Sequence, residues 1–502
     1  MDYIIVQAGG KGTRLGYLTE NKPKALVPVD NLPMLFHLFK KYSNKKFIII
    51  ADYKKEVLRE YLDCFANVKY RVIDAKGVGT CAGIKQSLEL VPEGQAFMLV
   101  WSDLILSEHF ELPGEYLDDN LAINDYIGIS QTFECRWSYA DGRFYEEKSS
   151  KHGVAGFFLF TDKAKLKDIS MEGELVRWMQ ERKMTFDEIG LAGTKEFGLL
   201  EEYEKLSRPK CRPFNRIIVD GDYVIKKPVD SQGENLAGME QAWYKKAAKL
   251  GIKILPKIFE SNPLKMEHIK GSHIFENNMS QNWKHMVLEI LVNELKQMHQ
   301  SDTIAGDIFS MKEVYFYKTF DRLNEIRDML PFADGKYINV NGKKCRNVFF
   351  YKRELERAIE KLECREFSFI HGDCTFSNII LKEEDGMPVL IDPRGYFGHT
   401  QLYGDVRYDW AKLYYSIIGN YDRFNRGDFR LNLGNRGIEL RIESNCWEHM
   451  EEEFFKLTGA DRYEIKLIHA VIWLSLTTYA WHDYDSVCGA FYNGLYYLED
   501  VL

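Results

Sequence analysis

Residues 369–395 of the chain read FIHGDCTFSNIILKEEDGMPVLIDPRG. Asp373 and Asn378 lie five positions apart in a loop after the apolar run FSFI, and Asp392 follows the apolar run PVLI. Phosphoryl transfer to a hydroxyl needs a carboxylate that orients the hydroxyl and takes its proton, together with oxygen ligands for Mg²⁺. The spacing therefore predicts Asp373 as the catalytic base and Asn378 with Asp392 as metal ligands.

The sequence around this stretch predicts a small sheet lobe followed by a large helical lobe. A β-hairpin with Asp-Gly at its turn is indicated by residues 216–227, RIIVDGDYVIKK. From residue 283 onwards apolar residues recur mostly at helical spacing, and the last third of the chain is rich in Tyr, Trp and Phe. This order of elements indicates an α+β domain.

These features resemble the aminoglycoside phosphotransferase and choline kinase family, whose fold is like that of eukaryotic protein kinases. The resemblance covers roughly residues 212–502. It implies that Lys226, in the second strand of the hairpin, binds the ATP phosphates and that Glu240 holds this lysine. Lys227, whose side chain has the opposite pleat, is the alternative to Lys226.

The same resemblance identifies the segment that would bind adenine. Residues 266–271, MEHIKG, look like the hinge of the family, with backbone contacts to the base at Glu267 and Ile269. The protein-kinase signatures HRD and DFG are replaced here by HGD and DPR, so a protein kinase is the weaker interpretation.

Four other polar residues of this half are interpreted separately. His299 resembles the end of a family helix and is predicted to be structural. Asp405 and Asp409 form a pair that the family often carries, and a structural role is favoured because Asp405 is well placed to cap a helix. Arg394, two residues past Asp392, is a candidate contact for the substrate or product phosphate, and a surface salt bridge is the alternative.

A second phosphate-handling loop opens the chain. Residues 6–29 read VQAGGKGTRLGYLTENKPKALVPV, in which GGKGTRLG directly follows the strand-like run YIIVQA at residues 3–8. Over roughly the first 160 residues, strand-like and helix-length segments alternate, which predicts βαβ units around a mostly parallel sheet. A dinucleotide fingerprint is excluded because Leu15 stands where its third glycine is required, and no Gly-Lys-Ser/Thr closes a P-loop.

This loop resembles the Rossmann-like nucleotidyltransferases that make sugar nucleotides and CDP-alcohols, and the resemblance covers most of residues 1–205. In that family a phosphate ester attacks the α-phosphorus of an NTP and pyrophosphate leaves. The residues that would hold the triphosphate are Gly10, Gly12 and Thr13. Arg14 would steady the leaving pyrophosphate, and Lys24 would bind the α-phosphate or the attacking phosphate.

Two further motifs agree with this resemblance. Gly79 and Thr80 lie in GVGTCAGI and match the turn that contacts the nucleotide base and ribose. Asp103 follows the strand-like run that ends in VW, where ligands bind in open α/β sheets, and a carboxylate there is the usual Mg²⁺ ligand.

The sequence departs from the family at a second metal-binding carboxylate. The family commonly has Asp-x-Gly-Thr late in the domain, whereas residues 191–194 read LAGT. Asp187, Glu188 and Glu196 are the candidates to replace the missing carboxylate.

The composition excludes several classes of protein. Apolar residues are 45% and charged residues 28%, as in soluble globular proteins, and the net charge of −8 argues against a nucleic-acid partner. The nine cysteines are odd in number and lack a CxxC motif, which indicates neither a disulfide framework nor a zinc site. The scattered cysteines predict a reducing cytoplasm. We expect no signal peptide, because the apolar run at the start of the sequence is short and lacks a basic flank, and no membrane insertion, because no run of ~18 uninterrupted apolar residues occurs. The oligomeric state is left open.

Two domains are expected from these patterns, since single cores rarely exceed ~250–300 residues. A basic, proline-containing linker at residues 205–214 separates a nucleotidyltransferase domain, 1–207, from a kinase-like phosphotransferase domain, 212–502.

The two resemblances together imply a bifunctional enzyme that uses Mg²⁺, ATP and a second NTP. A kinase makes a phosphate ester, and a nucleotidyltransferase consumes one to give an NDP-activated precursor, such as those used for surface polysaccharide. The expected acceptor is a sugar or polyol. One alternative is choline or ethanolamine, bound by the aromatic residues Trp473, Tyr479, Trp481 and Tyr484, although aromatics at helical spacing are more often core. Another is that one domain is degenerate.

Overall fold

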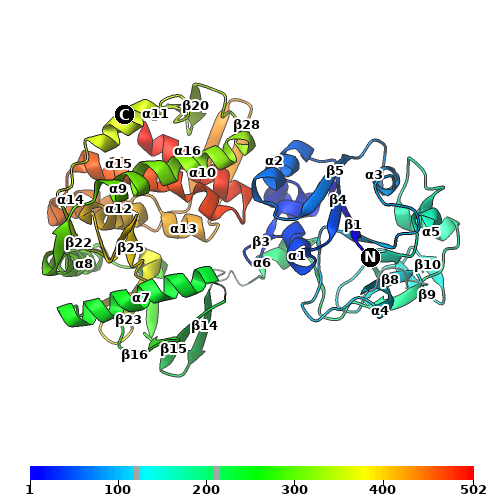
Figure 1. Ribbon diagram of the computed structural model, residues 1–502, viewed down its shortest axis with the longest axis horizontal. Helices are drawn as coiled ribbons and strands as arrows, with labels where there is room; N and C mark the ends of the chain where they lie inside the picture. The colour runs from blue at the N-terminus through cyan, green and yellow to red at the C-terminus, as the bar shows by residue number, and fades with distance from the viewer. Residues whose placement is uncertain (118–123, 207–214, 230) are drawn as a thin grey trace. The chain divides into compact units, whose positions relative to one another are not determined.

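The computed structural model describes residues 1–117, 124–206, 215–229 and 231–502, and the structural statements below concern these residues. They fall into two compact units, Met1–Ser207 with His482–Tyr484, and Arg208–Trp481 with Asp485–Leu502 (Figure 1). The predicted linker lies mostly outside the described residues, so the domain boundaries at 207 and 212 stay predictions.

The first unit is built on a twisted α/β sheet with strand order β10-β9-β11-β6-β1-β4-β5, and β8 pairs with β11 and β12. Its parallel centre consists of β1 (Tyr3–Gln7), β4 (Lys46–Ala51), β5 (Lys69–Asp74) and β6 (Phe97–Trp101). The other strands are β8 (Tyr126–Ser130), β9 (Ser138–Ala140), β10 (Arg143–Tyr145), β11 (Gly153–Phe160) and β12 (Asp187–Gly190). Strand β11 runs antiparallel to β6 and extends the sheet beyond its parallel centre.

Helices cover both faces of this sheet, because the central strands are apolar on both sides. The helices are α1 (Met34–Lys41), α2 (Lys55–Phe65), α3 (Thr80–Leu88), α4 (Gly114–Leu117), α5 (Leu175–Glu181) and α6 (Leu200–Glu204). Phe47 of β4 contacts Phe39 of α1 on one face, whereas Ile48 and Ile50 join the core beneath α3 on the other. The alternation of side chains along β4 therefore gives a three-layer arrangement.

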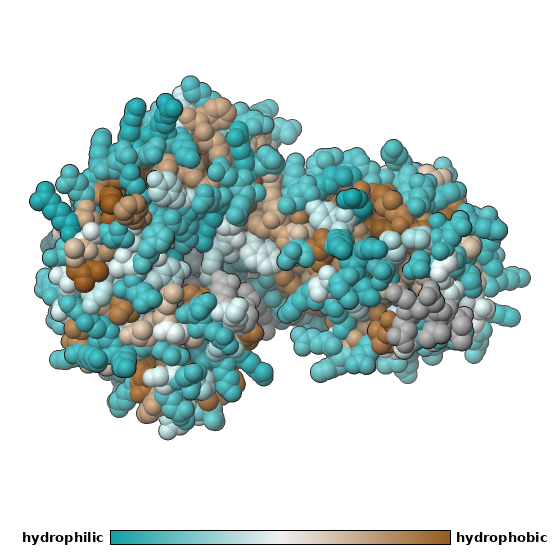
Figure 2. Space-filling view, viewed as in Figure 1, coloured by the Kyte–Doolittle hydropathy of each residue, from teal (hydrophilic) through white to brown (hydrophobic). Residues whose placement is uncertain are grey.

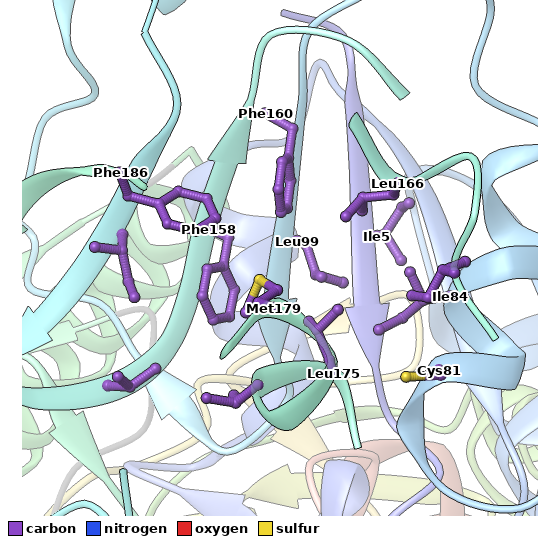
Figure 3. Packing of buried hydrophobic residues seen from close by; sticks show 14 of the residues in the cluster. Ile5, Cys81, Ile84, Leu99, Phe158, Phe160, Leu166, Leu175, Met179 and Phe186 are labelled. Carbon is purple, nitrogen blue, oxygen red and sulfur yellow. The ribbon is translucent and has the colours of Figure 1, made fainter. Parts of the chain in front are cut away.

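The larger core lies between the sheet and helices α3 and α5. Figure 3 shows Ile5 and Leu99 of the central strands facing Ile84 and Leu175 of these helices. Phe158 is fully buried. Its ring centre lies 6.2 Å from that of Phe160 and 6.1 Å from that of Phe186. This core fixes the strands whose carboxyl ends carry the glycine-rich loop and Asp103.

Short strand pairs complete the first unit. They are β2 (Pro28–Val29) with β3 (Leu32–Pro33), and β7 (Leu104–Ile105) with β13 (Lys195–Glu196).

The second unit has the expected small sheet lobe. Its sheet has the order β14-β15-β17-β16, and helix α7 (Ser231–Leu250) packs against β15. The strands are β14 (Asn215–Asp220), β15 (Tyr223–Pro228), β16 (Ile258–Ser261) and β17 (Leu264–Glu267). The predicted hairpin is confirmed: β14 pairs antiparallel with β15 around Gly221, whose φ of 60° suits the tight turn.

The rest of the second unit is mainly helical and also holds short strand pairs. The helices are α8 (Gln281–Ser301), α9 (Ile308–Lys312), α10 (Lys318–Ile326), α11 (Lys352–Glu360), α12 (Val406–Ile417), α13 (Tyr421–Asn425), α14 (Glu451–Thr458), α15 (Arg462–Leu476) and α16 (Tyr484–Leu498). The strands are β18 (Gly271–His273), β19 (Thr303–Ala305), β20 (Tyr337–Val340), β21 (Lys343–Arg346), β22 (Glu366–Phe369), β23 (Ile379–Lys382), β24 (Pro388–Leu390), β25 (Tyr396–Phe397), β26 (Thr400–Gln401), β27 (Tyr403–Gly404), β28 (Phe429–Gly434) and β29 (Gly437–Ile442). The predicted fold class is confirmed.

The surface in view in Figure 2 is mainly hydrophilic, with apolar residues in small groups. Among the described residues, no helix has the length and apolar character needed to cross a bilayer.

The core of the first unit yields a stability prediction. Phe158→Ala removes a fully buried ring and leaves a cavity, so we expect the unit to lose about 3–5 kcal/mol. Hydrogen exchange of the β1 amides measures this loss for the first unit separately. Tyr145→Ala, at a partly exposed position of β10, is the control. Unchanged exchange in Phe158→Ala would contradict the packing described.

Candidate active sites

The glycine-rich loop of the first unit turns back onto Lys24. Gly12 has a φ of 63°, and a Cβ at this position would lie 3.0 Å from both Lys24 Cβ and Thr19 Cγ2. The carbonyl of Gly12 accepts hydrogen bonds from Leu15 N and Thr19 Oγ1 at 2.8 and 3.2 Å. Glycine is therefore required at position 12 both by backbone conformation and by close approach. Around this turn, the predicted phosphate-binding residues Gly10, Thr13 and Arg14 are exposed.

Lys24 and Asp103, both predicted site residues, form an ion pair. Asp103 lies between β6 and β7, and β6 runs parallel to β1, which leads into the glycine-rich loop. Both side chains are mostly buried. The pair therefore lies at the carboxyl edge of the sheet, where open α/β sheets bind ligands.

Glu196 supplies a second carboxylate near this pair. Strand pairing sets Glu196 opposite Leu104, the residue after Asp103. Burial raises the pKa of Glu196, and the charge of Asp103 raises it further, while Lys24 and Arg14 act in the opposite direction. The other candidates, Asp187 and Glu188, are exposed on β12. Of the three carboxylates predicted as replacements for the missing metal ligand, Glu196 is the one that the structure places near Asp103.

The donor set at this edge fits a divalent cation. Asp103 and Glu196 are two carboxylates that repel each other, and a cation between carboxylate oxygens removes that repulsion. Among the described residues, no group of three or more His, Cys, Asp or Glu side chains is arranged to hold a metal ion. Mg²⁺ usually takes one or two carboxylates together with substrate phosphates and water.

The Gly79–Thr80 turn is tied to the start of α5. Gly79 has a φ of 88°, and a Cβ there would lie 2.4 Å from the carbonyl oxygen of Gly173. The hydroxyl of Thr80 accepts a hydrogen bond from Leu175 N at 2.8 Å. These contacts hold the turn in one conformation, which gives Gly79 and Thr80 a structural role. Their contact with a nucleotide base stays a prediction.

In the second unit, Lys226 lies between two carboxylates. Its Nζ is 2.8 Å from Glu240 Oε2 and 2.8 Å from Asp392 Oδ1. Burial acts to lower the pKa of Lys226, but Asp392 and Glu240 outweigh burial and raise it, so the ammonium is charged. Lys227, with the opposite pleat, is exposed. The structure thus brings together the predicted lysine, its glutamate and a predicted metal ligand.

The catalytic loop joins Asp373 to Asn378. Asn378 Nδ2 donates to the carbonyl of Asp373 at 2.9 Å and to its Oδ2 at 3.0 Å, which leaves the Asn378 amide oxygen for a metal. Lys412 of α12 forms an ion pair of 2.9 Å with Asp373 Oδ1. The oxygens of Asn378 and Asp392 are the kind of ligand that Mg²⁺ prefers.

Asp409 positions the start of this loop. Its carboxylate accepts hydrogen bonds from the backbone N–H groups of His371 and Gly372 at 2.9 and 2.7 Å, and it lies 2.9 Å from His299 Nε2. Asp405 accepts from the N–H of Arg407 at the start of α12. These contacts agree with the structural roles predicted for His299, Asp405 and Asp409.

The predicted hinge leaves the small sheet lobe at the end of β17. The N–H of Glu267 donates to the carbonyl of Lys257, and the chain continues through the buried Ile269 to β18. β18 pairs with β23, which follows the catalytic loop. The segment therefore connects the small sheet to the strands that follow the catalytic loop in the chain. Its contact with adenine stays a prediction.

Arg394 lies between two tyrosines. Its guanidinium donates to Tyr408 Oη at 2.8 Å and to Tyr396 Oη at 3.2 Å. In the described part of the chain, no carboxylate lies within ion-pair distance of Arg394, so the surface salt bridge considered above is absent there.

Of the aromatic residues considered for a choline cage, Tyr484 is almost fully buried, as core residues are. Trp473 is fully buried, and its Nε1 donates to His469 Nε2 at 3.0 Å. Tyr479 is partly exposed, and its ring centre lies 5.8 Å from the guanidinium of Arg322.

Lys412 and two basic residues of α10, Lys318 and Arg322, are absent from the sequence prediction. The only sequence signal for Lys412 is a charged residue inside an apolar helix, three positions after Asp409. A buried lysine at such a place needs a partner, which here is Asp373.

Comparison with known proteins confirms both resemblances. A model of the nucleotidyl transferase family matches residues 3–119, and a model of the phosphotransferase enzyme family matches residues 213–438. These matches indicate two enzyme activities, nucleotidyl transfer and phosphotransfer.

Curated relatives match part of the first unit. A D-glycero-α-D-manno-heptose 1-phosphate guanylyltransferase of Campylobacter jejuni is 35% identical over 19% of this chain and 45% of its own length. A UTP–glucose-1-phosphate uridylyltransferase of Haloferax volcanii is 44% identical over 12% of this chain and 26% of its own. A glucose-1-phosphate cytidylyltransferase of Salmonella typhimurium is 46% identical over 12% and 24%. The chain thus spans less than half the length of these relatives.

The Lys226 triad gives a prediction for the phosphotransferase half. Lys226→Met removes the cation nearest Asp392, so ADP formation from ATP should fall by about 10²–10³-fold. Lys227→Met, one residue away on the other face of the strand, is the matched control and should change the rate by less than about twofold. Equal losses in the two variants would contradict the assignment.

Glu196 gives a prediction for the nucleotidyltransferase half. Glu196→Gln removes a carboxylate beside Asp103, so half-maximal pyrophosphate release should need about 10–100-fold more Mg²⁺. Titration of Mg²⁺ with an NTP and a sugar 1-phosphate measures this shift. Glu188→Gln, exposed on β12, serves as the control, and a Mg²⁺ requirement shared by both variants argues against Glu196 as a ligand.

Proposed function

We propose that the chain is a bifunctional enzyme in which one half makes the substrate of the other. The phosphotransferase half transfers a phosphoryl group from ATP to a hydroxyl of a small sugar or polyol. The nucleotidyltransferase half couples the resulting phosphate ester to an NTP and releases pyrophosphate. The observation that carries the proposal is that each unit assembles its own set of cations and carboxylates suited to phosphate chemistry.

The phosphotransferase step uses the catalytic loop. Asp373 orients the acceptor hydroxyl and takes its proton as the oxygen attacks the γ-phosphorus and ADP leaves. Lys412 compensates the charge of the carboxylate, and the Asn378 amide holds its orientation. Lys226 binds the phosphates of ATP. Mg²⁺, held by Asn378 and Asp392, would neutralise charge on the transferring phosphoryl group.

The nucleotidyltransferase step uses the glycine-rich loop. The phosphate ester attacks the α-phosphorus, and charge accumulates on the phosphoryl oxygens and on the leaving pyrophosphate. Backbone N–H groups around Gly12 and the side chain of Lys24 stabilise this charge, and Arg14 steadies the pyrophosphate. Mg²⁺, held by Asp103 and Glu196, would neutralise the triphosphate.

A sugar is favoured over choline as the activated group. The three curated relatives described above are named for heptose or glucose 1-phosphates and differ in the base of the nucleotide, so their names support the sugar and leave the base open. We propose an NDP-activated sugar or polyol of the kind used for surface polysaccharide.

Separate loss of the two products tests the coupled scheme. The protein is incubated with Mg²⁺, ATP, each NTP and a panel of sugars, polyols and amino alcohols, and ADP and pyrophosphate are measured by mass spectrometry. Asp373→Ala should reduce ADP formation by about 10²–10⁴-fold and spare pyrophosphate release from a supplied phosphate ester. Asp103→Ala should do the reverse.

Two outcomes would contradict the scheme. Pyrophosphate release without any supplied or self-made phosphate ester would show that the two halves are not consecutive. Formation of one product under all conditions would show that one half is degenerate.

A further inference from the structure

The catalytic base of the phosphotransferase half lies beside a cluster of basic side chains. They come from α10, from the loop that leads into β25, and from α12: Lys318, Arg322, Arg394 and Lys412. We call them the basic cluster.

The basic cluster begins at the catalytic loop itself. Lys412 is paired with Asp373 at 2.9 Å. Arg394 lies beside Gly372, the residue before Asp373, because a Cβ on Gly372 would lie 2.9 Å from Arg394 Cβ. The backbone N–H of Arg394 also donates to the carbonyl of His371. An acceptor whose hydroxyl reaches Asp373 therefore lies next to both cations.

Lys318 and Arg322 add two basic residues of α10 to the cluster. They are four residues apart and share one face of α10. Burial lowers the pKa of Lys318 to about 6, with smaller contributions from the charges of Arg394, Arg322 and Lys412, while the charge of Glu313 acts in the opposite direction. The other three basic groups therefore lie within electrostatic reach of Lys318. Arg322 donates to the hydroxyl of Ser475 at 3.2 Å and to its carbonyl.

The cluster carries more positive than negative charge. Among the described residues, the only carboxylate in ion-pair contact with any of its members is Asp373. Arg394 and Arg322 are held instead by neutral oxygens of tyrosines and serine. Like charges on neighbouring half-buried side chains repel one another, and a bound anion relieves this repulsion. Clusters of this kind occur at functional sites.

The aromatic rings fix Arg394 for recognition. The centre of its guanidinium lies 4.5 Å from the ring centre of Tyr396 and 5.8 Å from that of Tyr408. Both tyrosine hydroxyls also accept hydrogen bonds from it. A guanidinium held in this way is suited to the planar or bidentate binding of a carboxylate or phosphate.

We propose that the basic cluster binds an anionic group of the acceptor, so that the phosphotransferase half acts on a sugar or polyol that already carries a phosphate or carboxylate. This inference rests on the proposed kinase activity and specifies its substrate class. The γ-phosphoryl group passes from ATP to the acceptor oxygen, the bond from the γ-phosphorus to the β,γ-bridging oxygen breaks, and the hydroxyl proton passes to Asp373. A cationic acceptor such as choline is disfavoured, because its ammonium would meet like charges.

Matched acceptors test the proposal directly. With ATP and Mg²⁺, ADP formation is compared for neutral hexoses, heptoses and polyols, for their terminal phosphates, and for the corresponding uronic or aldonic acids. At least one anionic acceptor should exceed its neutral counterpart in kcat/KM by on the order of 100-fold. The phosphate and carboxylate arms show which anion is recognised.

Variants assign the preference to the cluster. In the double variant Lys318→Gln/Arg322→Gln and in Arg394→Gln, the preference should shrink mainly through a higher KM for the anionic acceptor, and Arg394→Lys should restore part of it. The affinity for MgATP should stay unchanged. Lys361→Gln, an exposed position of the same unit, is the control and should keep the full preference.

The opposite results are distinguishable from failure of the proposed function. If neutral acceptors are phosphorylated as well as anionic ones, the kinase activity stands and the anion site is wrong. If the variants weaken MgATP instead, the cluster serves ATP and the proposal is wrong. If no acceptor yields ADP, the kinase proposal fails, and titration with inorganic phosphate decides the anion site: binding lost in the double variant supports it, and binding kept overturns it.

Discussion

The buried carboxylate of Asp409 is the constraint on which the phosphotransferase site depends. Burial would raise the pKa of Asp409. The hydrogen bond and charge of His299 and the backbone N–H of Gly372 outweigh burial, so the pKa is lowered. The carboxylate is thus held as an anion by donors from α8 and from the catalytic loop. Charge-assisted bonds of this kind are strong and directional, so Asp409 fixes the loop from which Asp373 projects.

The same electrostatic arrangement recurs in both units. Lys24 is paired with Asp103, Lys226 with Asp392, and Lys412 with Asp373. In the first two pairs, a cation suited to phosphate lies against a carboxylate suited to a metal. A metal nucleotide complex can satisfy both partners of such a pair at once, because it offers anionic oxygens to the lysine and a cation to the carboxylate.

The sequence predicted which candidate residues lie together where they are close along one segment. Asp373, Asn378 and Asp392 lie within one loop and the strands that follow it, and pleat separates Lys226 from Lys227. It was insufficient where chemistry depends on tertiary contacts. Glu196 reaches Asp103 through a pair of two-residue strands, too short to be recognised from periodicity. From the sequence of α10, Lys318 and Arg322 would be taken for solvent-exposed residues of an amphipathic helix. The packing of α10 brings them near Arg394 and Lys412.

The lowered pKa of Lys318 links acceptor binding to proton uptake. With a pKa of about 6, the amine is largely neutral at pH 7 while the cluster holds no anion. Glu313 is the carboxylate that acts against this lowering. An anion bound as proposed would stabilise the ammonium further, so the protein would take up a proton from solution as the acceptor enters. Phosphorylation of the hydroxyl later releases a proton through Asp373. Binding and chemistry therefore exchange protons with the solvent in opposite directions, and the pH dependence of acceptor affinity need not follow that of turnover.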